Sequence, residues 1–355
     1  MSSNLNPGEH TIAEILSEPE TWRSCLAALD KTAELRDLSG KLQRTVEWVF
    51  VGCGSSFYLA QIAASTWSIL TGDAARAVPA SEILLFPKTL PASCQIVLIS
   101  RSGHTSEVIE AARYLKRERT TPTLAITCST GTPLEEIATY TIRLSTADEK
   151  STVMTRSFTS MLLALQSLAG FRAGALEFLT AFHQLPAEAE KFLPVAQKTV
   201  QSLVSSHTFA DYVFLGQGPF FGVAQESMLK VKEMSCSYAQ SFHTLEFRHG
   251  PKAIVSPETL LTFFLSESGF ESEAPLLHEM KELGAVTLVI ANRATTAVRK
   301  SADYLVELSL TIPEPARAAA AVIPGQLLGF YSGLRKGLDP DSPRNLSRVV
   351  MLEGK

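Results

Sequence analysis

The chain has 355 residues, of which 45% are hydrophobic and 19% are charged, and its 32 basic and 36 acidic side chains give a formal net charge of −4. This composition is typical of a soluble globular protein, and the length predicts two domains, each large enough to bury a core of its own. The acidic balance argues against a surface that tracks nucleic-acid phosphates. We therefore expect no nucleic-acid partner.

The sequence also lacks the signals of membrane or secreted proteins. Its longest apolar runs, residues 260–265 and 318–323, are far shorter than the roughly 20 residues that a spanning helix needs. Residues 1–4 are polar and lead into no apolar stretch, so we expect a cytoplasmic protein without a membrane partner. The five cysteines are odd in number and scattered, which predicts reduced core thiols, not disulfides or a zinc site. They are Cys25, Cys53, Cys94, Cys128 and Cys236.

The chain contains one pattern twice. An apolar stretch ending at Gly52 runs into small residues, and a similar stretch ends at Gly216, 164 residues later. Residues 96–103 are echoed by residues 261–269, with Ser102 and Ser268 at an offset of 166. A third pair, 124–127 and 288–291, again lies 164 residues apart. Three matches in one order at nearly one offset indicate two copies of one domain.

Within each copy, short apolar strands alternate with longer helical patterns, which predicts an α/β fold of parallel βαβ units with helices on both faces of the sheet. Apolar spacing predicts one helix over 106–117 and another from Ala224 towards Met234. Pro19 suits the first turn of an earlier helix, and Pro186 and Pro194 indicate a connector. We expect an N-terminal helical segment, a first domain, a connector, a second domain and a tail, over residues 1–35, 36–183, 184–200, 201–345 and 346–355 respectively.

In open parallel sheets, ligands bind beyond the carboxyl ends of the strands, where the first copy carries two hydroxyl-rich turns. One contains Ser55 and Ser56 after the first strand, and the other is residues 100–105 before the helix at Ser106. Helix-terminal N–H groups favour an anion, and the hydroxyls of Ser56, Ser100, Ser102 and Thr105 add donors without charge. These serines can also simply cap helices. Two such turns in one copy favour a phosphate monoester site over capping.

The second copy departs from this pattern. Residues 216–219 (Gly-Gln-Gly-Pro) carry no hydroxyl, and Glu267 and Glu271 place negative charge around Ser266 and Ser268, which would repel a phosphate. The glycine spacing after the strand does not fit the dinucleotide-binding fingerprint, and there is no Walker loop. The sequence thus predicts one phosphate-competent copy and no nucleotide, metal or other cofactor.

Charge is concentrated on the predicted helix of the second copy. Glu226, Lys230 and Glu233 are spaced by four and three residues, so they project from one side. A solvated, ion-paired helix face is one interpretation of this spacing. His249, which precedes a turn-forming Gly-Pro pair, reads by itself as a surface histidine. A carboxylate and a histidine near a phosphate pocket would also suit proton transfer next to a sugar carbonyl.

Taken together, these residues resemble the tandem sugar-isomerase (SIS) family that includes the isomerase half of glucosamine-6-phosphate synthase and related amino-sugar-phosphate deaminases and isomerases. The resemblance covers nearly the whole chain and implies two flavodoxin-like parallel sheets. It is carried by six ordered motifs, at residues 52–56, 100–105, 149–159, 226–233, 247–251 and 341–346.

The resemblance implies roles for individual residues. Ser56, Ser100, Ser102 and Thr105 would hold the substrate phosphate. The remaining lining residues would be Ser55, Arg101, Thr152 through its backbone, Glu226, Ser347 and Arg348. Glu233 would shuttle the proton between adjacent sugar carbons, with Lys230 beside the substrate. His249 would open the sugar ring from a neighbouring subunit, which implies a catalytic homodimer.

Two departures from the synthase pattern bear on the reaction. Arg101 replaces a glutamine and adds a cation able to meet a phosphate or a carboxylate. Arg348 stands at the place of the lysine that forms a Schiff base with the ketose, and arginine cannot serve as that amine; Lys355 is too far along the chain to replace it. We also expect no glutaminase domain, because 355 residues leave no room for one beside two SIS copies.

These features favour an enzyme that isomerises a hexose or amino-sugar 6-phosphate, releasing ammonia when an amine is present. Two alternatives remain open. In the first, the chain is a non-catalytic sugar-phosphate sensor that regulates a partner. In the second, it is the transferase subunit of a split synthase and receives ammonia from a separate source.

Overall fold

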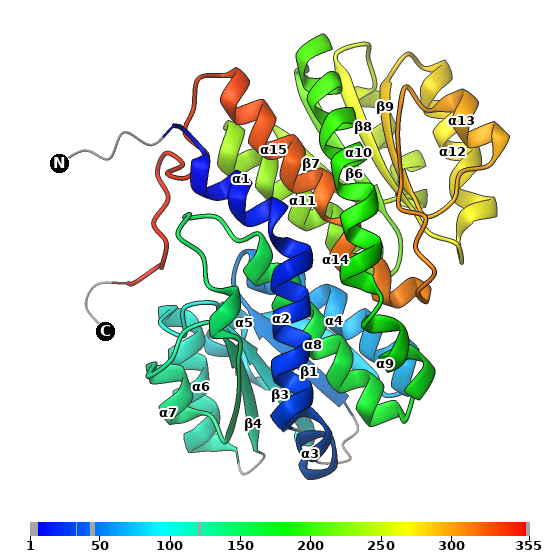
Figure 1. The fold of residues 1–355 in the computed structure, drawn as a ribbon. Coiled ribbons are helices and arrows are strands. Elements are labelled where there is room, and N and C mark those ends of the chain that lie inside the picture. The colour runs from blue at the N-terminus through cyan, green and yellow to red at the C-terminus, as the bar shows by residue number, and fades with distance from the viewer. Residues whose placement is uncertain (1–5, 33, 43–46, 120–121, 353–355) are drawn as a thin grey trace. The chain divides into compact units, whose positions relative to one another are not determined.

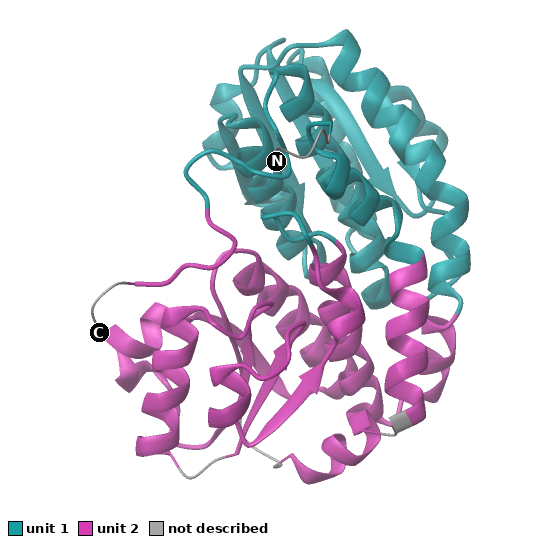
Figure 2. Ribbon diagram, turned by 60° about the vertical axis from the view of Figure 1, so that its left-hand side comes forward, with its two compact units in different colours: residues 1–19, 150–155, 184–346 teal, residues 20–149, 156–183, 347–355 magenta. Residues whose placement is uncertain are grey.

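The computed structural model describes residues 6–32, 34–42, 47–119 and 122–352. Residues 1–4 and Lys355, which entered the expectations about a leader and a terminal amine, lie outside this part. The chain divides into two compact units (Figure 2). Unit 1 contains residues 1–19, 150–155 and 184–346, and unit 2 contains residues 20–149, 156–183 and 347–355.

Unit 2 is built on a parallel five-stranded sheet in the order β2-β1-β3-β4-β5. Its strands are β1 (Glu47–Gly52), β2 (Ala74–Pro79), β3 (Cys94–Ile99), β4 (Thr123–Thr127) and β5 (Tyr140–Arg143). Its helices are α2 (Glu18–Thr32, which begins at the end of unit 1), α3 (Glu34–Lys41), α4 (Ser55–Thr71), α5 (Ala80–Leu85), α6 (Ser106–Glu118), α7 (Pro133–Ile137), α8 (Arg156–Ala173) and α9 (Leu176–Phe182). This strand order is that of flavodoxin-like folds.

Unit 1 repeats the same topology, with the order β10-β9-β8-β6-β7. Its strands are β6 (Asp211–Gly216), β7 (Ala239–His243), β8 (Thr259–Leu265), β9 (Val286–Ala291) and β10 (Tyr304–Glu307). Its helices are α1 (Glu9–Leu16), α10 (Leu185–Ser206), α11 (Pro219–Ser235), α12 (Phe270–Glu282), α13 (Thr296–Ser301), α14 (Ala318–Ala321) and α15 (Ile323–Arg335). Short 3-10 turns cover Leu245–Arg248, Pro251–Ile254 and Glu314–Arg317. The predicted α/β fold with two copies of one domain is confirmed.

Both sheets are covered by helices on two faces (Figure 1). In unit 2, α4 packs on β1 and β2 and is itself covered by α8, while α5, α6 and α7 close a second apolar core on the other face. In unit 1, α11 packs on β6 and β7 and is covered by α15, while α12 and α13 close the opposite core. Alternate residues of a strand point to opposite faces of the sheet. Every second residue of β1, such as Val49 and Val51, therefore enters the core under α5, α6 and α7.

The junction of first strand and first helix is the same in both units. A Cβ at Gly52 would lie 2.5 Å from the backbone of Ser56, and one at Gly216 would lie 2.1 Å from that of Phe220. Two residues on, Gly54 and Gly218 adopt φ angles of 56° and 55°, which glycine reaches without steric cost. Glycine at these four places lets each helix begin directly against the end of its strand.

Two predicted helices are present, and the predicted connector is helical. The predicted helices over 106–117 and from Ala224 are confirmed as α6 and α11, although α11 begins earlier, at Pro219. Residues 184–200, expected as a connector, fall almost entirely within the long helix α10. Pro186 lies in the first turn of α10, where a missing N–H costs nothing, and Pro194 is tolerated inside the helix.

The prediction of core thiols holds for three cysteines. Cys25, Cys94 and Cys128 are buried, and burial raises the pKa of each thiol. Cys53 is partly buried, and burial raises its pKa to about 11. For Cys236 the prediction is wrong, because this residue ends α11 in a left-handed conformation and is exposed. All five cysteines are free.

Helix α1 is tied to distant segments of unit 1. Its residue Glu14 accepts hydrogen bonds from the N–H of Lys150 at 2.5 Å and from the hydroxyl of Ser151 at 2.5 Å. The carboxylate of Asp341 accepts the N–H and the hydroxyl of Thr11 at 2.7 and 2.6 Å. These contacts explain why residues 1–19 and 150–155 group with the second copy.

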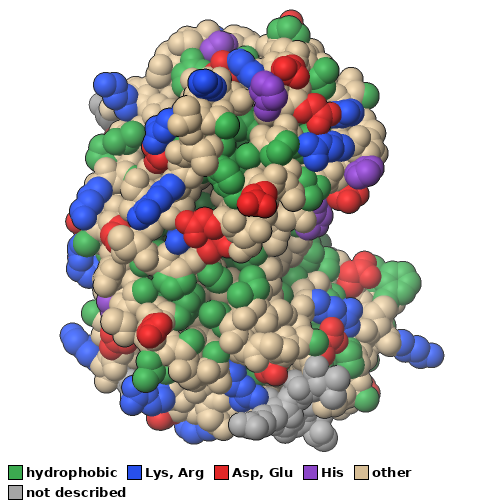
Figure 3. All heavy atoms as spheres, turned by 90° about the vertical axis from the view of Figure 1, so that its right-hand side faces the viewer, with side chains coloured by type: hydrophobic (Ala, Val, Ile, Leu, Met, Phe, Trp, Pro, Cys, Tyr) green, Lys and Arg blue, Asp and Glu red, His purple; other side chains and the backbone are tan. Residues whose placement is uncertain are grey.

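The surface shows no segregation of charge on the face drawn in Figure 3, where basic and acidic side chains are interspersed. Within the part of the chain that the structure describes, no helix is both long and apolar enough to span a bilayer.

Candidate active site

The first serine loop, residues 100–105, follows β3 and leads into α6 in unit 2. The Ser100 hydroxyl accepts the N–H of Gly103 at 3.1 Å and lies 3.1 Å from the Thr105 hydroxyl. The Ser102 hydroxyl accepts the N–H of His104 at 3.1 Å and is partly exposed. Thr105 is the N-cap residue of α6, but its side chain makes no capping hydrogen bond. The hydroxyls therefore shape the loop itself, and simple capping by Thr105 does not explain it.

Ser55 and Ser56 occupy the first turn of α4, at the end of the neighbouring strand β1. Both are buried. Since β1 and β3 are parallel neighbours, their carboxyl ends meet at one edge of the sheet. The two hydroxyl-rich turns of unit 2 are thus placed at the same edge, as the sequence predicts.

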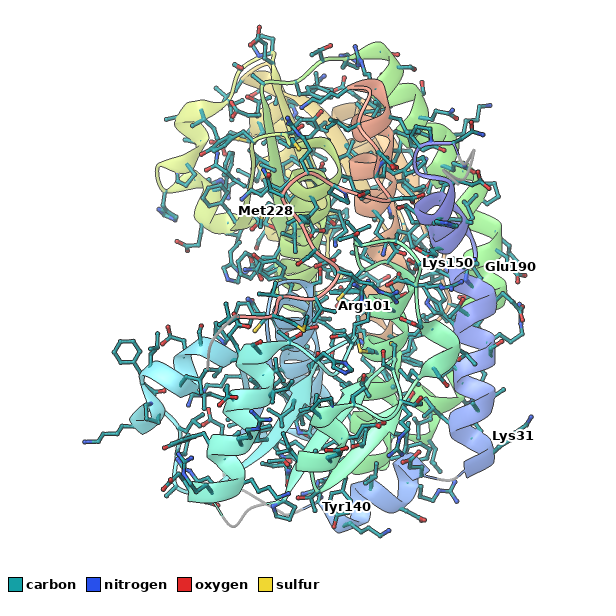
Figure 4. All side chains as sticks on the ribbon, turned by 90° about the vertical axis from the view of Figure 1, so that its left-hand side faces the viewer. Lys31, Arg101, Tyr140, Lys150, Glu190 and Met228 are labelled. Atoms are coloured by element: carbon teal, nitrogen blue, oxygen red, sulfur yellow. The ribbon has the colours of Figure 1, made fainter. Side chains whose placement is uncertain are left out.

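Arg101 is buried at the centre of the first serine loop, with 5% of the side chain exposed. One guanidinium nitrogen donates to Glu149 at 3.2 Å, and another donates to the carbonyl of Arg348 at 3.1 Å. Glu149 is fully buried and also accepts the N–H of Ser157 at 3.3 Å. Figure 4 shows Arg101 enclosed by neighbouring side chains, in contrast to Lys31, which points outward from α2.

The tail residues expected in the pocket also lie in unit 2. The guanidinium of Arg348 pairs with Asp148 at 2.7 Å, and the side chain is about half exposed. The Ser347 hydroxyl donates to the carbonyl of Val349 at 2.9 Å. Thr152 belongs to unit 1, where its N–H donates to the carbonyl of Asp341 at 3.1 Å.

Helix α11 of unit 1 carries a buried charge triad. Lys230 is fully buried and lies 3.2 Å from Glu226 and 2.5 Å from Glu233. Glu226 is fully buried as well, whereas 18% of the Glu233 side chain is exposed. Burial by itself lowers the pKa of Lys230, but the two carboxylates outweigh it and raise the pKa above its usual value of 10.5. The interpretation of a solvated helix face is therefore wrong.

His249 lies in an exposed loop of unit 1 between two 3-10 turns. Among the residues that the structure describes, its ring has no hydrogen-bond partner. The loop is held on both sides by Glu279 of α12, whose carboxylate accepts Arg248 at 2.9 Å and Lys252 at 2.7 Å. These two hydrogen bonds lower the pKa of Glu279. Sequence reasoning missed Glu279, because its partners are about 30 residues away in the chain.

The second serine loop, residues 266–269, occupies the matching place in unit 1, between β8 and α12. Its donors are taken by carboxylates that the sequence did not single out. Glu273 accepts the N–H and hydroxyl of Ser266 at 2.9 and 2.7 Å. Glu314 accepts the N–H groups of Glu267 and Ser268 and the Ser268 hydroxyl. Glu267 itself turns to Arg317, at 2.7 Å.

Burial raises the pKa of Glu273, an effect that the hydrogen bonds from Ser266 oppose and the charge of Glu314 reinforces. The expected charge around this loop is thus present, but it comes mainly from Glu273 and Glu314. Exposed Glu271, which the sequence favoured, contacts none of the loop donors in the described part of the chain. That part also contains no group of three His, Cys, Asp or Glu side chains suited to a metal ion.

Curated relatives align with this chain over most of its length. The glutamine–fructose-6-phosphate aminotransferase of Methanothermobacter thermautotrophicus is 24% identical over 344 residues, covering 96% of this chain and 57% of the relative. The enzyme of the same name from Mycobacterium bovis is 30% identical over 336 residues, covering 89% and 53%. The chain therefore spans a little over half the length of these relatives.

Solved structures match the fold throughout. Glucosamine-6-phosphate deaminase from Thermotoga maritima superposes with a TM-score of 0.82 at 28% identity, covering 97% of this chain and all of that chain. Tagatose-6-phosphate ketose/aldose isomerase from Escherichia coli gives a TM-score of 0.84 at 22% identity, covering 99% and 100%. The model of the SIS domain matches residues 42–170 and 211–328, one match for each sheet. The chain belongs to the SIS-domain family.

Proposed function

We propose that the chain isomerises a hexose or amino-sugar 6-phosphate, and that it releases ammonia when the substrate carries an amine. The α11 triad is the observation that carries this proposal. Complete burial of Lys230 and Glu226 costs desolvation energy. Hydrophobic residues of similar size at these positions would not incur this cost. The arrangement leaves Glu233 with one side at the surface and a fixed cation on the other. A partly exposed carboxylate held in this way suits a proton carrier, because such a group must reach its substrate.

The proposed reaction has two proton-transfer stages. His249 passes the proton of the C1 hydroxyl to the ring oxygen, which opens the sugar to its aldehyde form. Glu233 then removes the proton from C2 and returns it to C1 through an enediol or enolamine. With an amine at C2, the resulting imine takes up one water and releases ammonia, leaving the ketose phosphate. Histidine and glutamate side chains are among the groups that most often carry protons in such steps.

In this proposal the phosphate is held by the hydroxyls of Ser56, Ser100, Ser102 and Thr105. Neutral hydroxyls and backbone N–H groups are good partners for a phosphate. Arg101 already bonds to Glu149 and to the Arg348 carbonyl, so we assign it to positioning the loop. Ser55, the Thr152 backbone, Glu226, Ser347 and Arg348 complete the proposed set.

The deaminase from Thermotoga maritima supports this choice, because its whole chain aligns with this one at 28% identity. The Schiff-base chemistry of a synthase receives no support from Arg348, which stays a cation paired with Asp148. We therefore favour isomerisation with deamination over glutamine-driven synthesis.

An activity assay tests the proposal. Glucosamine 6-phosphate, fructose 6-phosphate and tagatose 6-phosphate are incubated with the chain, and ketose, aldose and ammonia are measured. Glu233→Gln should lower turnover by about 10²- to 10⁴-fold, the usual contribution of a general base. Glu258→Gln, which changes an exposed glutamate of the same unit, should behave like the parent. Turnover that is equal in Glu233→Gln and the parent, or no product from any sugar, would refute the proposal.

A sugar phosphate that raises the melting temperature without any turnover would support a sensor instead. A split synthase would form glucosamine 6-phosphate only when ammonia is supplied together with fructose 6-phosphate. The assay therefore separates the three readings.

The proposed homodimer has its own test. His249→Asn should lose turnover with cyclic sugars, whereas His278→Asn, at an exposed histidine of α12, should keep it. Mixing the Glu233→Gln and His249→Asn chains should restore activity if His249 acts on a substrate bound by the partner subunit. Mixed dimers that form, as shown by differently tagged chains, but stay inactive would contradict this arrangement.

A further inference from the structure

The two serine loops use one turn. In the first, the Ser100 hydroxyl accepts the N–H of Gly103 at 3.1 Å, and in the second, the Ser266 hydroxyl accepts the N–H of Gly269 at 2.9 Å. Each loop connects the central strand of its sheet to the helix that follows. The second loop is therefore built like the first, although their charges differ.

Three donors of the second loop converge on one carboxylate. Glu314 accepts the N–H of Glu267, the N–H of Ser268 at 3.3 Å and the Ser268 hydroxyl at 2.5 Å. Two successive N–H groups and a serine hydroxyl directed at a single anionic group form an anion-binding arrangement. By the repeat, the matching groups of the first loop belong to Arg101 and Ser102.

The surroundings of Glu314 provide both charge and space. Arg317, three residues further on, is buried and pairs with Glu267 at 2.7 Å, and Asn292 donates to the same carboxylate at 3.0 Å. A cavity of about 10 Å³, enough for one water, lies beside this network and is lined by Glu314, Arg317 and Asn292 among others. Truncating Glu314 would enlarge this cavity beside the loop donors.

We propose that the second serine loop is an anion-binding site whose resident ligand is the carboxylate of Glu314. The chain fills this loop with its own anion. Removing the carboxylate exposes a site for a phosphate or sulfate ion on the N–H groups of Glu267 and Ser268. This proposal is independent of the reaction assigned above.

Inorganic phosphate is the probe for this site. Binding is measured by titration calorimetry, and the melting temperature is recorded against phosphate concentration, for the parent and Glu314→Ala. Because the first loop is itself a proposed phosphate site, the same pair is repeated in a Ser102→Ala background. We expect Glu314→Ala to bind one more phosphate per chain than its parent in both backgrounds, and phosphate to restore the stability that the substitution removes.

Two controls make the result specific. Glu271→Ala removes an exposed carboxylate from the first turn of α12 and should gain no phosphate. Ser268→Ala, added to Glu314→Ala, should lose most of the gained binding, because it deletes one donor. An equal gain in Glu271→Ala would mean that net charge alone is responsible, and the proposal would fail.

The proposal is also overturned if Glu314→Ala folds and binds no more phosphate than the parent, or if it stays unfolded at every phosphate concentration. In the second case the ion cannot take the carboxylate's place. If instead the parent binds no phosphate while Glu314→Ala binds one, the inference stands and the phosphate site proposed for the first loop is wrong.

Discussion

The first and second serine loops share a turn, a strand-to-helix position and an ion pair, but the polarity of that pair is reversed. In the first loop, the residue after the first serine is Arg101, paired with the buried Glu149. In the second loop, the equivalent residue is Glu267, paired with Arg317. The duplicated fold has thus kept the device that fixes the loop and has changed the charge that the loop carries.

The difference shows how a duplicated domain can acquire two tasks. The first copy keeps hydroxyls at the ends of β1 and β3, while the second copy closes its loop with Glu314 and Glu273. The second copy then carries ionisable groups elsewhere, on α11 and in the loop of His249. In the proposed function, the first copy binds the phosphate and the second transfers the proton.

The largest expected effect concerns the two ion pairs. Glu149→Gln removes the negative charge that pairs with the buried Arg101 and should lower the free energy of unfolding by about 3–5 kcal/mol. Glu267→Gln should lower it by about 1 kcal/mol or less, because the side chain of Glu267 is about half exposed. Urea unfolding at pH 7 measures both. The comparison requires the Arg101–Glu149 pair to be more deeply buried than the Arg317–Glu267 pair. Equal losses of unfolding free energy in the two variants would contradict this difference.

A smaller effect is expected in acid. Burial raises the pKa of Glu267, but the hydrogen bonds from Arg317 and Asn292 outweigh it and hold the pKa below its usual 4.5. Ionised Glu267 therefore stabilises the fold above about pH 4.5, and this contribution is lost as the pH falls through the lowered value.

The measurement is the difference in unfolding free energy between the parent and Glu267→Gln, followed from pH 7 to pH 3. We expect the difference to shrink below about pH 4.5. A difference that grows in acid would contradict the assignment of the Glu267–Arg317 pair.

Much of the fold follows from local patterns. The repeat offset predicts two matching sheets. In the structure, Gly52 and Gly216 each allow a helix to begin against the end of its strand. Apolar spacing predicts α6, which buries one stripe, and α11, which is buried over most of its surface. The prolines of α10 led to the wrong prediction of a connector, because Pro186 lies in the first turn, where a proline fits a helix.

The site is predicted less completely. Ser100, Ser102 and Glu233 stand in recognisable local patterns, whereas Glu149 and Glu314 lie 46 to 48 residues from the loop residues that they hold. Such pairings depend on which segments the folded chain brings together. Spacing also placed Glu226 and Lys230 on one helix side but could not show that this side is buried.

We propose that the first serine loop holds the substrate phosphate and the second does not, and one titration compares the two. Glucosamine 6-phosphate is titrated into Ser102→Ala and its matched counterpart Ser268→Ala. We predict that Ser102→Ala weakens binding by about 10- to 100-fold, because a hydrogen bond to a charged group contributes about 1.5–3 kcal/mol, and that Ser268→Ala binds like the parent. Equal weakening in both variants, or weakening in Ser268→Ala alone, would contradict the account.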